Sequence, residues 1–357
     1  MTATAAPPIR HTISMIMPAL NEAESIAETF ATLFAQTRLP EEIVVADGGS
    51  TDGTPELVRS YDGRQGIRVI CVANPERYCG GGRNAAFRAA SGSLMVGMDF
   101  GNRADPHYVE RMEQAFLADP SADYAGGPHF SIIETSFERA YAAMVDYWGV
   151  RCQTLSSEEM LQLAKRYGFA PGGMNLALTR SFYLRSGGFP AWAGSADDVL
   201  MGMRAKHLGA RIVPVPTAVV WYHMGRSTGE TWRRLRNYAR WNAKLGIQLG
   251  AYRTLLTVMI LALALLIAGA WVWQAAVAGV VLALCWPLVI GMRRQLRLHV
   301  ALRRMPRLQD LFWAVWLAAA CDLAVLRGLA GGLIDRLRDP TWPMRTRQWI
   351  QAAPTAI

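Results

Sequence analysis

Residues 42–54 read EIVVADGGSTDGT, and this stretch decides the fold class. Residues 42–46 are short and rich in β-branched side chains, which is typical of a buried strand. The strand ends at Asp47, and the glycines and small polar residues after it indicate a loop. A helix is predicted to begin at Pro55. The stretch therefore places a polar loop between the carboxyl end of a strand and a helix.

Strands and helices alternate on either side of this stretch. The sequence predicts further strands at 13–18, 68–72 and 94–98, and helices at 23–34 (with Asn21 as its N-cap), 55–61 and 83–90. Such alternation predicts an α/β fold with a mostly parallel sheet covered by helices on both faces. Ligands of such sheets bind beyond the carboxyl ends of the strands. Pro18, Asp47 and Asp99 occupy those ends here, so we expect the site at that edge.

Composition separates the chain into two parts. The chain has 357 residues, and its apolar fraction of 52% with 18% charged residues excludes a disordered or collagen-like protein. Residues 1–232 hold 20 basic and 24 acidic residues, whereas residues 233–357 hold 17 and 4. A basic and apolar second part favours a membrane partner and argues against nucleic acid.

Cysteine spacing and the first residues add two expectations. Five scattered cysteines form neither a disulfide framework nor a zinc motif. The first residues lack a basic-then-apolar signal pattern, so we expect the globular part in the cytoplasm.

Residues 254–292 form an uncharged stretch of 39 positions. One helix of this length would reach about 58 Å, roughly twice the hydrocarbon core of a bilayer. We therefore predict a transmembrane hairpin with its turn near residues 271–274. Arginines flank both ends, which places both flanks in the cytoplasm and the tip outside.

A third apolar stretch, residues 311–326, is interrupted by Asp322. An interfacial, amphipathic helix is favoured over a third span, and both interpretations stay open. The predicted regions are a globular domain at 1–250, the hairpin at 251–292, a basic cytoplasmic loop at 293–309, an interfacial or third membrane helix at 310–334, and a basic tail at 335–357.

The residue types at the strand ends suggest chemistry. A carboxylate at Asp47 suits a nucleobase or ribose, and the glycines 80–82 followed by Arg83 suit a diphosphate. Asp99 suits a divalent cation. The adjacent carboxylates Asp197 and Asp198 either raise one pKa toward that of a general base or cap the helix predicted at 199–208.

In this order, the motifs resemble the family 2 glycosyltransferases with a GT-A fold. The matching segments are 18–22, 47–54, 82–84, 171–175, 187–189 and 197–204, and the resemblance covers about residues 12–245. It implies a GT-A-like α/β domain followed by a transmembrane hairpin and an amphipathic helix. It also implies inverting transfer from a nucleotide-diphosphate sugar, with UDP favoured, to a polyprenyl- or lipid-linked acceptor. The implied setting is cell-surface polysaccharide synthesis at the bacterial inner membrane, with the catalytic domain cytoplasmic.

The resemblance assigns roles by position. Pro18, Glu22, Asp47, Arg83 and Asp99 would bind the nucleotide sugar, and Asp198 would be the catalytic base. Gly172, Gly173, Asn175, Asp197, Arg240 and Trp241 would line the sugar and acceptor pocket. Mg²⁺ or Mn²⁺ would bind at Asp99, with His223 as a second candidate ligand.

Two departures from the family pattern keep alternatives open. Asp99 is followed by Phe-Gly-Asn, so the second acid of the family's D-x-D motif is missing. Either Asn102 or Asp105 replaces it or Asp99 acts alone, which leaves metal dependence open and keeps a non-catalytic subunit as an alternative. Residues 237–241 resemble the Q-x-x-R-W motif of processive synthases with Asn for Gln, so processive synthesis is the other alternative. Arg240 and Trp241 either contact an acceptor or lie on a helix that meets lipid phosphates.

Overall fold

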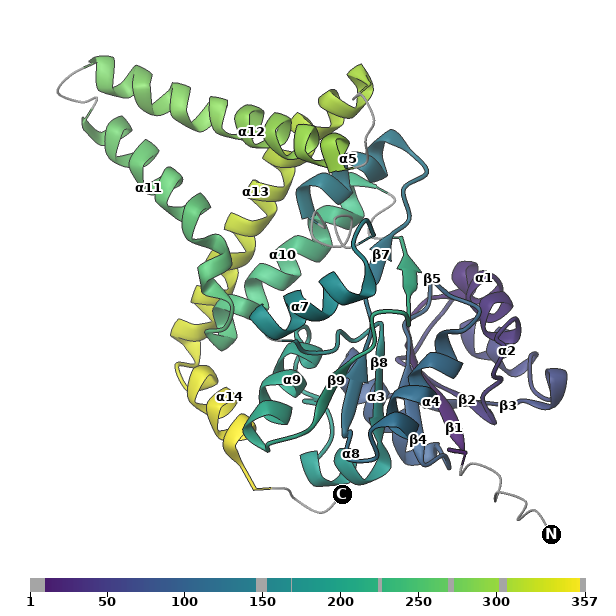
Figure 1. Cartoon of the computed structure of the whole chain (residues 1–357). Coiled ribbons are helices and arrows are strands. Elements are labelled where there is room, and N and C mark those ends of the chain that lie inside the picture. The colour runs from purple at the N-terminus through teal and green to yellow at the C-terminus, as the bar shows by residue number, and fades with distance from the viewer. Residues whose placement is uncertain are drawn as a thin grey trace, which may run out of the picture. The chain divides into compact units, whose positions relative to one another are not determined.

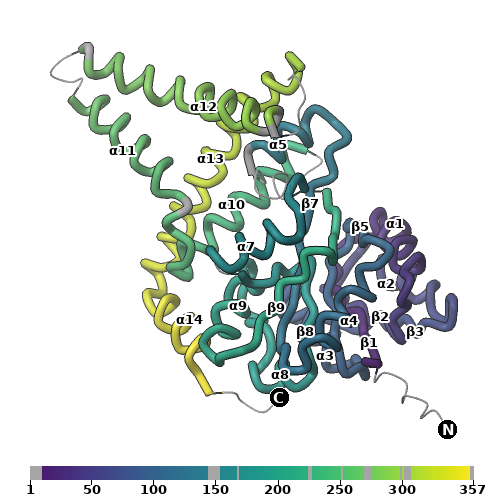
Figure 2. Tube along the Cα trace, in the orientation of Figure 1, coloured from purple at the N-terminus to yellow at the C-terminus, as the bar shows by residue number. Residues whose placement is uncertain are grey.

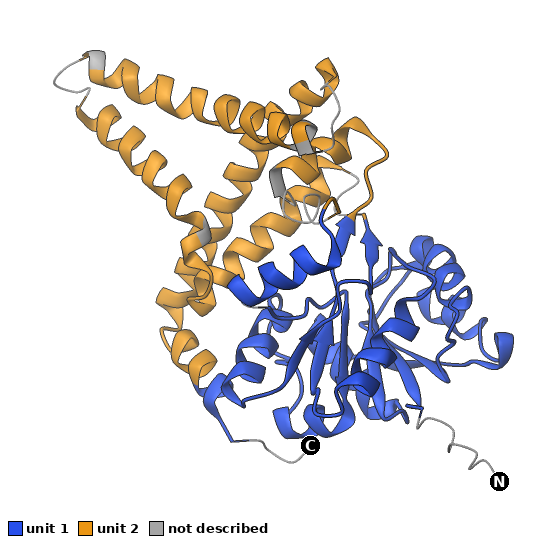
Figure 3. Ribbon diagram, viewed as in Figure 1, with its two compact units in different colours: residues 1–130, 155–222, 348–357 blue, residues 131–154, 223–347 orange. Residues whose placement is uncertain are grey.

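The computed structural model describes residues 10–145, 153–167, 169–223, 227–268, 273–301 and 307–353. The chain divides into two compact units (Figure 3). Unit 1 comprises residues 1–130, 155–222 and 348–357, and unit 2 comprises residues 131–154 and 223–347.

Unit 1 is built on a sheet of order β3-β2-β1-β4-β8-β6-β9 (Figures 1 and 2). Its strands are β1 Ile13–Ala19, β2 Glu42–Asp47, β3 Arg68–Ala73, β4 Leu94–Gly97, β6 Tyr124–Gly126, β8 Leu176–Thr179 and β9 Ile212–Pro214. The pairs β1–β2, β2–β3, β1–β4 and β6–β9 are parallel, whereas β8 runs antiparallel to β4 and β6. This confirms the predicted α/β class and its mostly parallel sheet. A smaller sheet has the order β5-β10-β7, with β5 Asn102–Ala104, β10 Val220–Tyr222 and β7 His129–Ser131.

Helices cover both faces of the large sheet, so strand β1 is buried on both of its faces. Met15 and Met17 pack in one cluster with Phe30 of a first helix, while Ile16 packs in another with Ala86 and Met201. A strand buried on both faces reads as a continuous apolar run, as β1 does. The helices of unit 1 are α1 Ala23–Phe34, α2 Thr54–Arg59, α3 Cys79–Ala89, α4 Tyr108–Ala118, α7 Ser157–Tyr167, α8 Arg180–Ser186 and α9 Asp197–His207, with a 3₁₀ turn at Arg64–Gly66.

Two local expectations in unit 1 are wrong. Helix α3 begins at Cys79 and not at the predicted residue 83, so the glycines 80–82 form its first turn. Glycine is needed there because a Cβ at Gly82 would lie 2.8 Å from the Pro18 Cβ. The N-cap of α1 is Glu22 and not Asn21, because Asn21 takes a left-handed φ of 58° and its Oδ1 accepts a hydrogen bond from the Thr51 N–H at 2.9 Å.

Unit 2 is helical. Its elements are α5 Ser136–Val145, α10 Thr228–Leu245, a 3₁₀ turn at Leu249–Tyr252, α11 Arg253–Ala268, α12 Trp273–Ala301, α13 Leu308–Arg338 and most of α14 Trp342–Gln351. Helices α11 and α12 cover the predicted hairpin, while residues 271 and 272 of its predicted turn lie outside the described residues. Residues 293–301 continue α12, so this part of the predicted loop is helical instead.

Within the described residues, two helices are long and apolar enough to cross a membrane. They are residues 275–297 of α12 and the whole of α13, by length and composition, while α11 is apolar but shorter. Residues 310–334, predicted as an interfacial or third membrane helix, belong to a 31-residue helix that has the length of a span.

Candidate functional site

Arg83 occupies the centre of an acidic cluster at the carboxyl edge of the large sheet. Its side chain is only 2% exposed and lies on α3. Nη2 donates to Asp99 Oδ1 at 2.8 Å, and Nη1 donates to Asp197 Oδ2. The charge of Asp198 also acts on Arg83. Three carboxylates from two distant segments thus share one guanidinium, which leaves the cluster negative when all three are ionised.

The two adjacent acids open helix α9. Burial raises the pKa of Asp197 to about 6; the Arg83 charge opposes this shift, and the charges of Asp198 and Asp99 add to it. Burial therefore contributes more than the neighbouring carboxylate that the sequence suggested as the cause. Asp198 accepts hydrogen bonds from the Gly173 N–H at Oδ2 (2.9 Å) and from the Val199 N–H at Oδ1 (2.8 Å). These bonds orient its carboxylate.

The segment 172–175 supports this cluster. A Cβ at Gly173 would lie 2.5 Å from Arg83 Nη2, so a larger residue there would force the buried guanidinium to move. Asn175 is fully buried, and its Nδ2 donates to the carbonyls of Pro128 (2.8 Å) and Ala218 (2.9 Å). Its Oδ1 accepts from the Gly127 N–H at 3.1 Å. Asn175 is thus held by three backbone groups, while the pocket contact predicted for it stays a prediction.

The residues predicted for the nucleotide lie at the same edge of the sheet. Asp47 ends β2, and β1 separates β2 from the β4 strand that precedes Asp99, so the two strand ends are roughly 10 Å apart. Asp47 Oδ2 accepts from the Gly49 N–H at 2.9 Å and the Ser50 N–H at 3.1 Å. Glu22 accepts from Ser25 Oγ at 2.6 Å. No hydrogen bond joins Asp47 to the Arg83 cluster within the described parts of the chain.

The loop 47–54 is anchored to the start of α1 by residues to which the sequence reasoning gave no role. Asp52 Oδ2 accepts from the Ala23 N–H at 3.0 Å, and Asp52 Oδ1 accepts from Thr54 Oγ1 at 2.6 Å. Thr54 Oγ1 in turn accepts from the Glu22 N–H at 2.8 Å. The signal was present in the motif, because Asp and Thr commonly bond nearby backbone groups. These bonds hold the loop in one conformation beside Glu22.

His129 is a second residue that sequence reasoning missed. A Cβ at Gly172 would lie 3.9 Å from Asp198 Oδ2 and 3.9 Å from His129 Cε1, so the glycine leaves a gap between these two side chains. The His129 ring also packs edge-on against Tyr222, with centroids 5.4 Å apart. No motif surrounds His129, and the fold alone brings it to the candidate base.

Three predicted residues belong to unit 2. His223 Nδ1 and Glu138 Oε1 form a buried pair at 3.0 Å. Arg240 donates from Nε and Nη2 to the Asp335 carboxylate at 2.7 and 2.9 Å. Trp241 meets Trp342 edge-to-face, with centroids 6.2 Å apart. The structure therefore gives each of them a partner inside unit 2.

A divalent cation fits this site only together with oxygens of a substrate. Among the described residues, no group of three His, Cys, Asp or Glu side chains could hold a metal. Mg²⁺ is commonly bound by one or two carboxylates plus substrate phosphates. Asp99 is 34% exposed and gives one oxygen to Arg83, so its remaining oxygen suits that arrangement.

Fold and site define an α/β protein with an acidic ligand site at the carboxyl edge of a mostly parallel sheet. The model of the glycosyl transferase family 2 matches residues 14–183, which include β1 to β8, Arg83 and Asp99. Residues 14–183 are therefore similar to glycosyl transferase family 2.

Relatives with known names agree with that family. The succinoglycan biosynthesis protein ExoA of Rhizobium meliloti is 36% identical over 111 residues, which cover 29% of this chain and 32% of that protein. The UDP-Glc:alpha-D-GlcNAc-diphosphoundecaprenol beta-1,3-glucosyltransferase WfaP of Escherichia coli is 26% identical over 157 residues, covering 40% and 59%. The chain spans only 22–32% of the length of the first curated relatives it matches.

A solved structure is similar in outline. It is the mannosyltransferase PcManGT from Pyrobaculum calidifontis in complex with GDP-Man and Mn²⁺, with a TM-score of 0.47 and 21% identity. The alignment covers 96% of this chain and 86% of that one.

Proposed function

We propose that this protein is an inverting glycosyltransferase that moves a sugar from a nucleotide-diphosphate sugar to a lipid-linked acceptor held in a membrane. The observation that carries the proposal is the cluster of Asp99, Asp197 and Asp198 around the buried Arg83. It lies at the ligand-binding edge of a family 2 domain. A negative, incompletely compensated cluster at such an edge is a common mark of a catalytic site.

Asp198 is the proposed general base. As the acceptor hydroxyl oxygen attacks the anomeric carbon, its proton passes to the Asp198 carboxylate and the bond from that carbon to the diphosphate oxygen breaks. The nucleoside diphosphate leaves with the bonding electron pair, and the anomeric configuration inverts. The hydrogen bonds from the Gly173 and Val199 N–H groups support this role, because they fix the carboxylate before the acceptor arrives.

The donor nucleotide is proposed to lie along Pro18, Glu22 and Asp47, with its diphosphate toward Asp99. Arg83 was predicted to bind the diphosphate directly, but its burial and its two carboxylate partners favour a role in holding Asp99 and Asp197 in place. A Mg²⁺ or Mn²⁺ ion at Asp99 would supply positive charge to the leaving diphosphate. UDP is the proposed nucleotide because the name of the relative WfaP specifies UDP-Glc.

Two observations support the proposed acceptor and the proposed location of the protein: the helices of unit 2 and the names of the relatives. The name of WfaP specifies a diphosphoundecaprenol acceptor, and ExoA is named for succinoglycan biosynthesis. The two helices that are long enough to cross a membrane suit an enzyme whose acceptor is confined to one. We propose the cytoplasmic face of the bacterial inner membrane, because the basic residues on both sides of the uncharged stretch favour it.

A nucleotide-release assay tests this proposal. Membranes containing the full chain are supplied with a panel of UDP-, GDP- and dTDP-sugars and an extract of lipid-linked acceptors, with Mg²⁺, Mn²⁺ or EDTA. We expect release with one donor, dependent on both the acceptor extract and the metal.

Each other outcome corrects a different part of the proposal. No release across the whole panel would contradict an enzymatic role and favour a non-catalytic subunit. Long polymers in place of single-sugar products would favour a processive synthase. Full activity in EDTA would remove the proposed metal at Asp99.

A further inference from the structure

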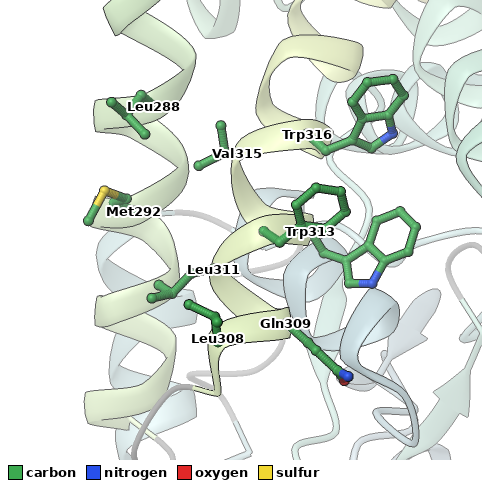
Figure 4. Close-up of a pocket in the computed structure, with 9 residues that line it drawn as sticks. Leu288, Met292, Leu308, Gln309, Leu311, Trp313, Val315 and Trp316 are labelled. Atoms are coloured by element: carbon green, nitrogen blue, oxygen red, sulfur yellow. The ribbon is translucent and has the colours of Figure 1, made fainter.

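Helices α12 and α13 enclose an open groove of about 850 Å³ within unit 2 (Figure 4). Nine residues line it, and all except Gln309 are apolar. Leu288 and Met292 come from α12, while Leu311, Val315 and the rings of Trp313 and Trp316 come from α13. The groove therefore offers a long apolar contact surface with aromatic rings along one side.

Several residues of this groove are far more exposed than apolar side chains in water usually are. Leu308 is 84% exposed, Phe312 64% and Trp316 54%. Burying each such side chain is worth about 1.5–3 kcal/mol, so apolar material is expected to cover them. Both helices have the length and composition of membrane spans, which makes that material hydrocarbon.

One end of the groove is strongly basic. Met292 is followed on α12 by the exposed Arg293, Arg294 and Arg297, and Leu308 is preceded by the exposed Arg307. Two acids act near this end: Asp310 is buried and bound to Arg139 at 3.0 Å, and the charge of Asp322 acts on Arg294. An anionic group at this end would still meet the guanidinium groups of Arg293, Arg297 and Arg307.

We propose that this groove binds the hydrocarbon chain of a polyprenyl phosphate or diphosphate, with its phosphate against the arginines at the Met292 end. A space between two packed helices suits one branched chain, since neighbouring helix axes lie about 8–10 Å apart. The inference rests on the proposed function, because such a lipid would be the carrier of the acceptor. It adds where the carrier binds and which end of the groove receives its phosphate.

Photo-cross-linking tests the groove directly. The full chain is placed in phosphatidylcholine nanodiscs with a diazirine-bearing polyprenyl phosphate, and the labelled peptides are identified by mass spectrometry. We expect labelling concentrated in residues 288–292 and 311–316. Undecaprenyl phosphate should compete for it, while undecaprenol and phosphatidylglycerol should not.

Matched variants separate the groove from the general lipid-facing surface. Val315→Trp fills the groove and should lower labelling about tenfold, equivalent to 1.4 kcal/mol. Val281→Trp, at an exposed position of α12 outside the groove, should leave labelling unchanged. The double variant Arg293→Gln with Arg297→Gln should remove the preference for the phosphate over undecaprenol.

Two results would overturn the inference. One is labelling spread evenly along α12 and α13, and the other is equal competition by phosphatidylglycerol or undecaprenol. Because cross-linking needs no sugar transfer, a failed groove and a failed glycosyltransferase remain distinguishable. Transfer that survives Val315→Trp without labelling rejects the groove alone, whereas specific labelling without transfer from any donor rejects the proposed function alone.

Discussion

Two buried charged clusters at opposite edges of the large sheet behave in opposite ways. At the first residue of β2, the Glu42 carboxylate is buried and accepts hydrogen bonds from Ser14 Oγ at 2.6 Å and Ser91 Oγ at 2.9 Å, and also from Arg68. Burial by itself would raise the pKa of Glu42, yet these bonds lower it to about 2. At the opposite edge of the sheet, burial raises the pKa of Asp197 to about 6 despite its bond to Arg83.

The two clusters differ in how many of their polar groups have hydrogen-bond partners and in how far their charges are balanced. Both carboxylate oxygens of Glu42 accept hydrogen bonds, and these stabilise its negative charge. We therefore assign Glu42 a role in stabilising the fold only. In the Arg83 cluster three carboxylates share one cation, and Arg83 Nε is buried with no hydrogen-bond partner among the described residues. A buried polar group without a partner is rare in a folded protein. This difference supports the proposal that substrate binds at the Arg83 cluster.

The largest effect is expected for Asp198→Asn. Removing the base should lower sugar transfer by about 10²–10⁴-fold, because no carboxylate then accepts the proton of the acceptor hydroxyl. Thermal unfolding should change little, since the Asn side chain keeps one acceptor for a backbone N–H. Glu56→Gln, at an exposed position of α2, is the control and should retain full transfer. Undiminished transfer by Asp198→Asn would remove the proposed mechanism.

A pair of glycine variants gives the next largest effect. Gly173→Ala places a Cβ 2.5 Å from Arg83 Nη2, so the guanidinium must move and take its carboxylates with it. Transfer should fall by about 10–100-fold, as expected when catalytic groups are misplaced by about 1 Å. Gly172→Ala meets nothing closer than 3.9 Å and should cost less than Gly173→Ala. Equal losses in initial-rate assays would show that the Arg83 position does not matter.

His129→Ala should have a smaller effect on transfer. The ring lies across the Gly172 gap from Asp198, so we expect it to position the acceptor. Loss of one hydrogen bond of about 0.5–1.5 kcal/mol predicts a roughly 2–10-fold drop in kcat/KM for the acceptor, with KM for the donor unchanged. His129→Gln should restore part of the loss. A purely structural histidine would instead lower the unfolding temperature of His129→Ala and leave the two KM values unchanged.

Glu42→Gln should leave transfer by the folded protein unchanged and lower its stability by about 2 kcal/mol, as for a buried hydrogen-bonded charge. The pH dependence follows from the lowered pKa. Stability from Glu42 is fully present above its ordinary pKa of 4.5 and is lost as pH falls toward 2. Chemical denaturation gives the free energy of unfolding at each pH between 3 and 6. This free energy should rise less steeply with pH in Glu42→Gln than in the unchanged protein. An identical slope in both proteins would contradict the assignment.

Local sequence patterns predicted the local structure well. The helix at 23–34 begins and ends where it was predicted, and the strands at 13, 42, 68 and 94 begin at the predicted residues. Turn residues and alternating apolar runs carry this information within a few positions. The antiparallel insertion of β8 between β4 and β6 was not predicted, because strand pairing depends on contacts between distant segments.

The site was predicted in part for the same reason. Asp99, Asp197 and Asp198 stand out as acids at a strand end and a helix start, and the structure brings them together at Arg83. The burial of Arg83 and the position of His129 depend on packing between segments far apart in the chain. No short motif encodes such packing, so these features became visible only in the folded structure.

Hydrogen–deuterium exchange tests the central claim most directly. The full chain is compared with and without the nucleoside diphosphate of the donor identified in the release assay, in the presence of Mn²⁺. The account predicts slower exchange at the carboxyl edge, in residues 47–54, 79–83 and 99–102, and no change at the amino edge in residues 91–93. Slower exchange at the amino edge, with the carboxyl edge unchanged, would contradict it.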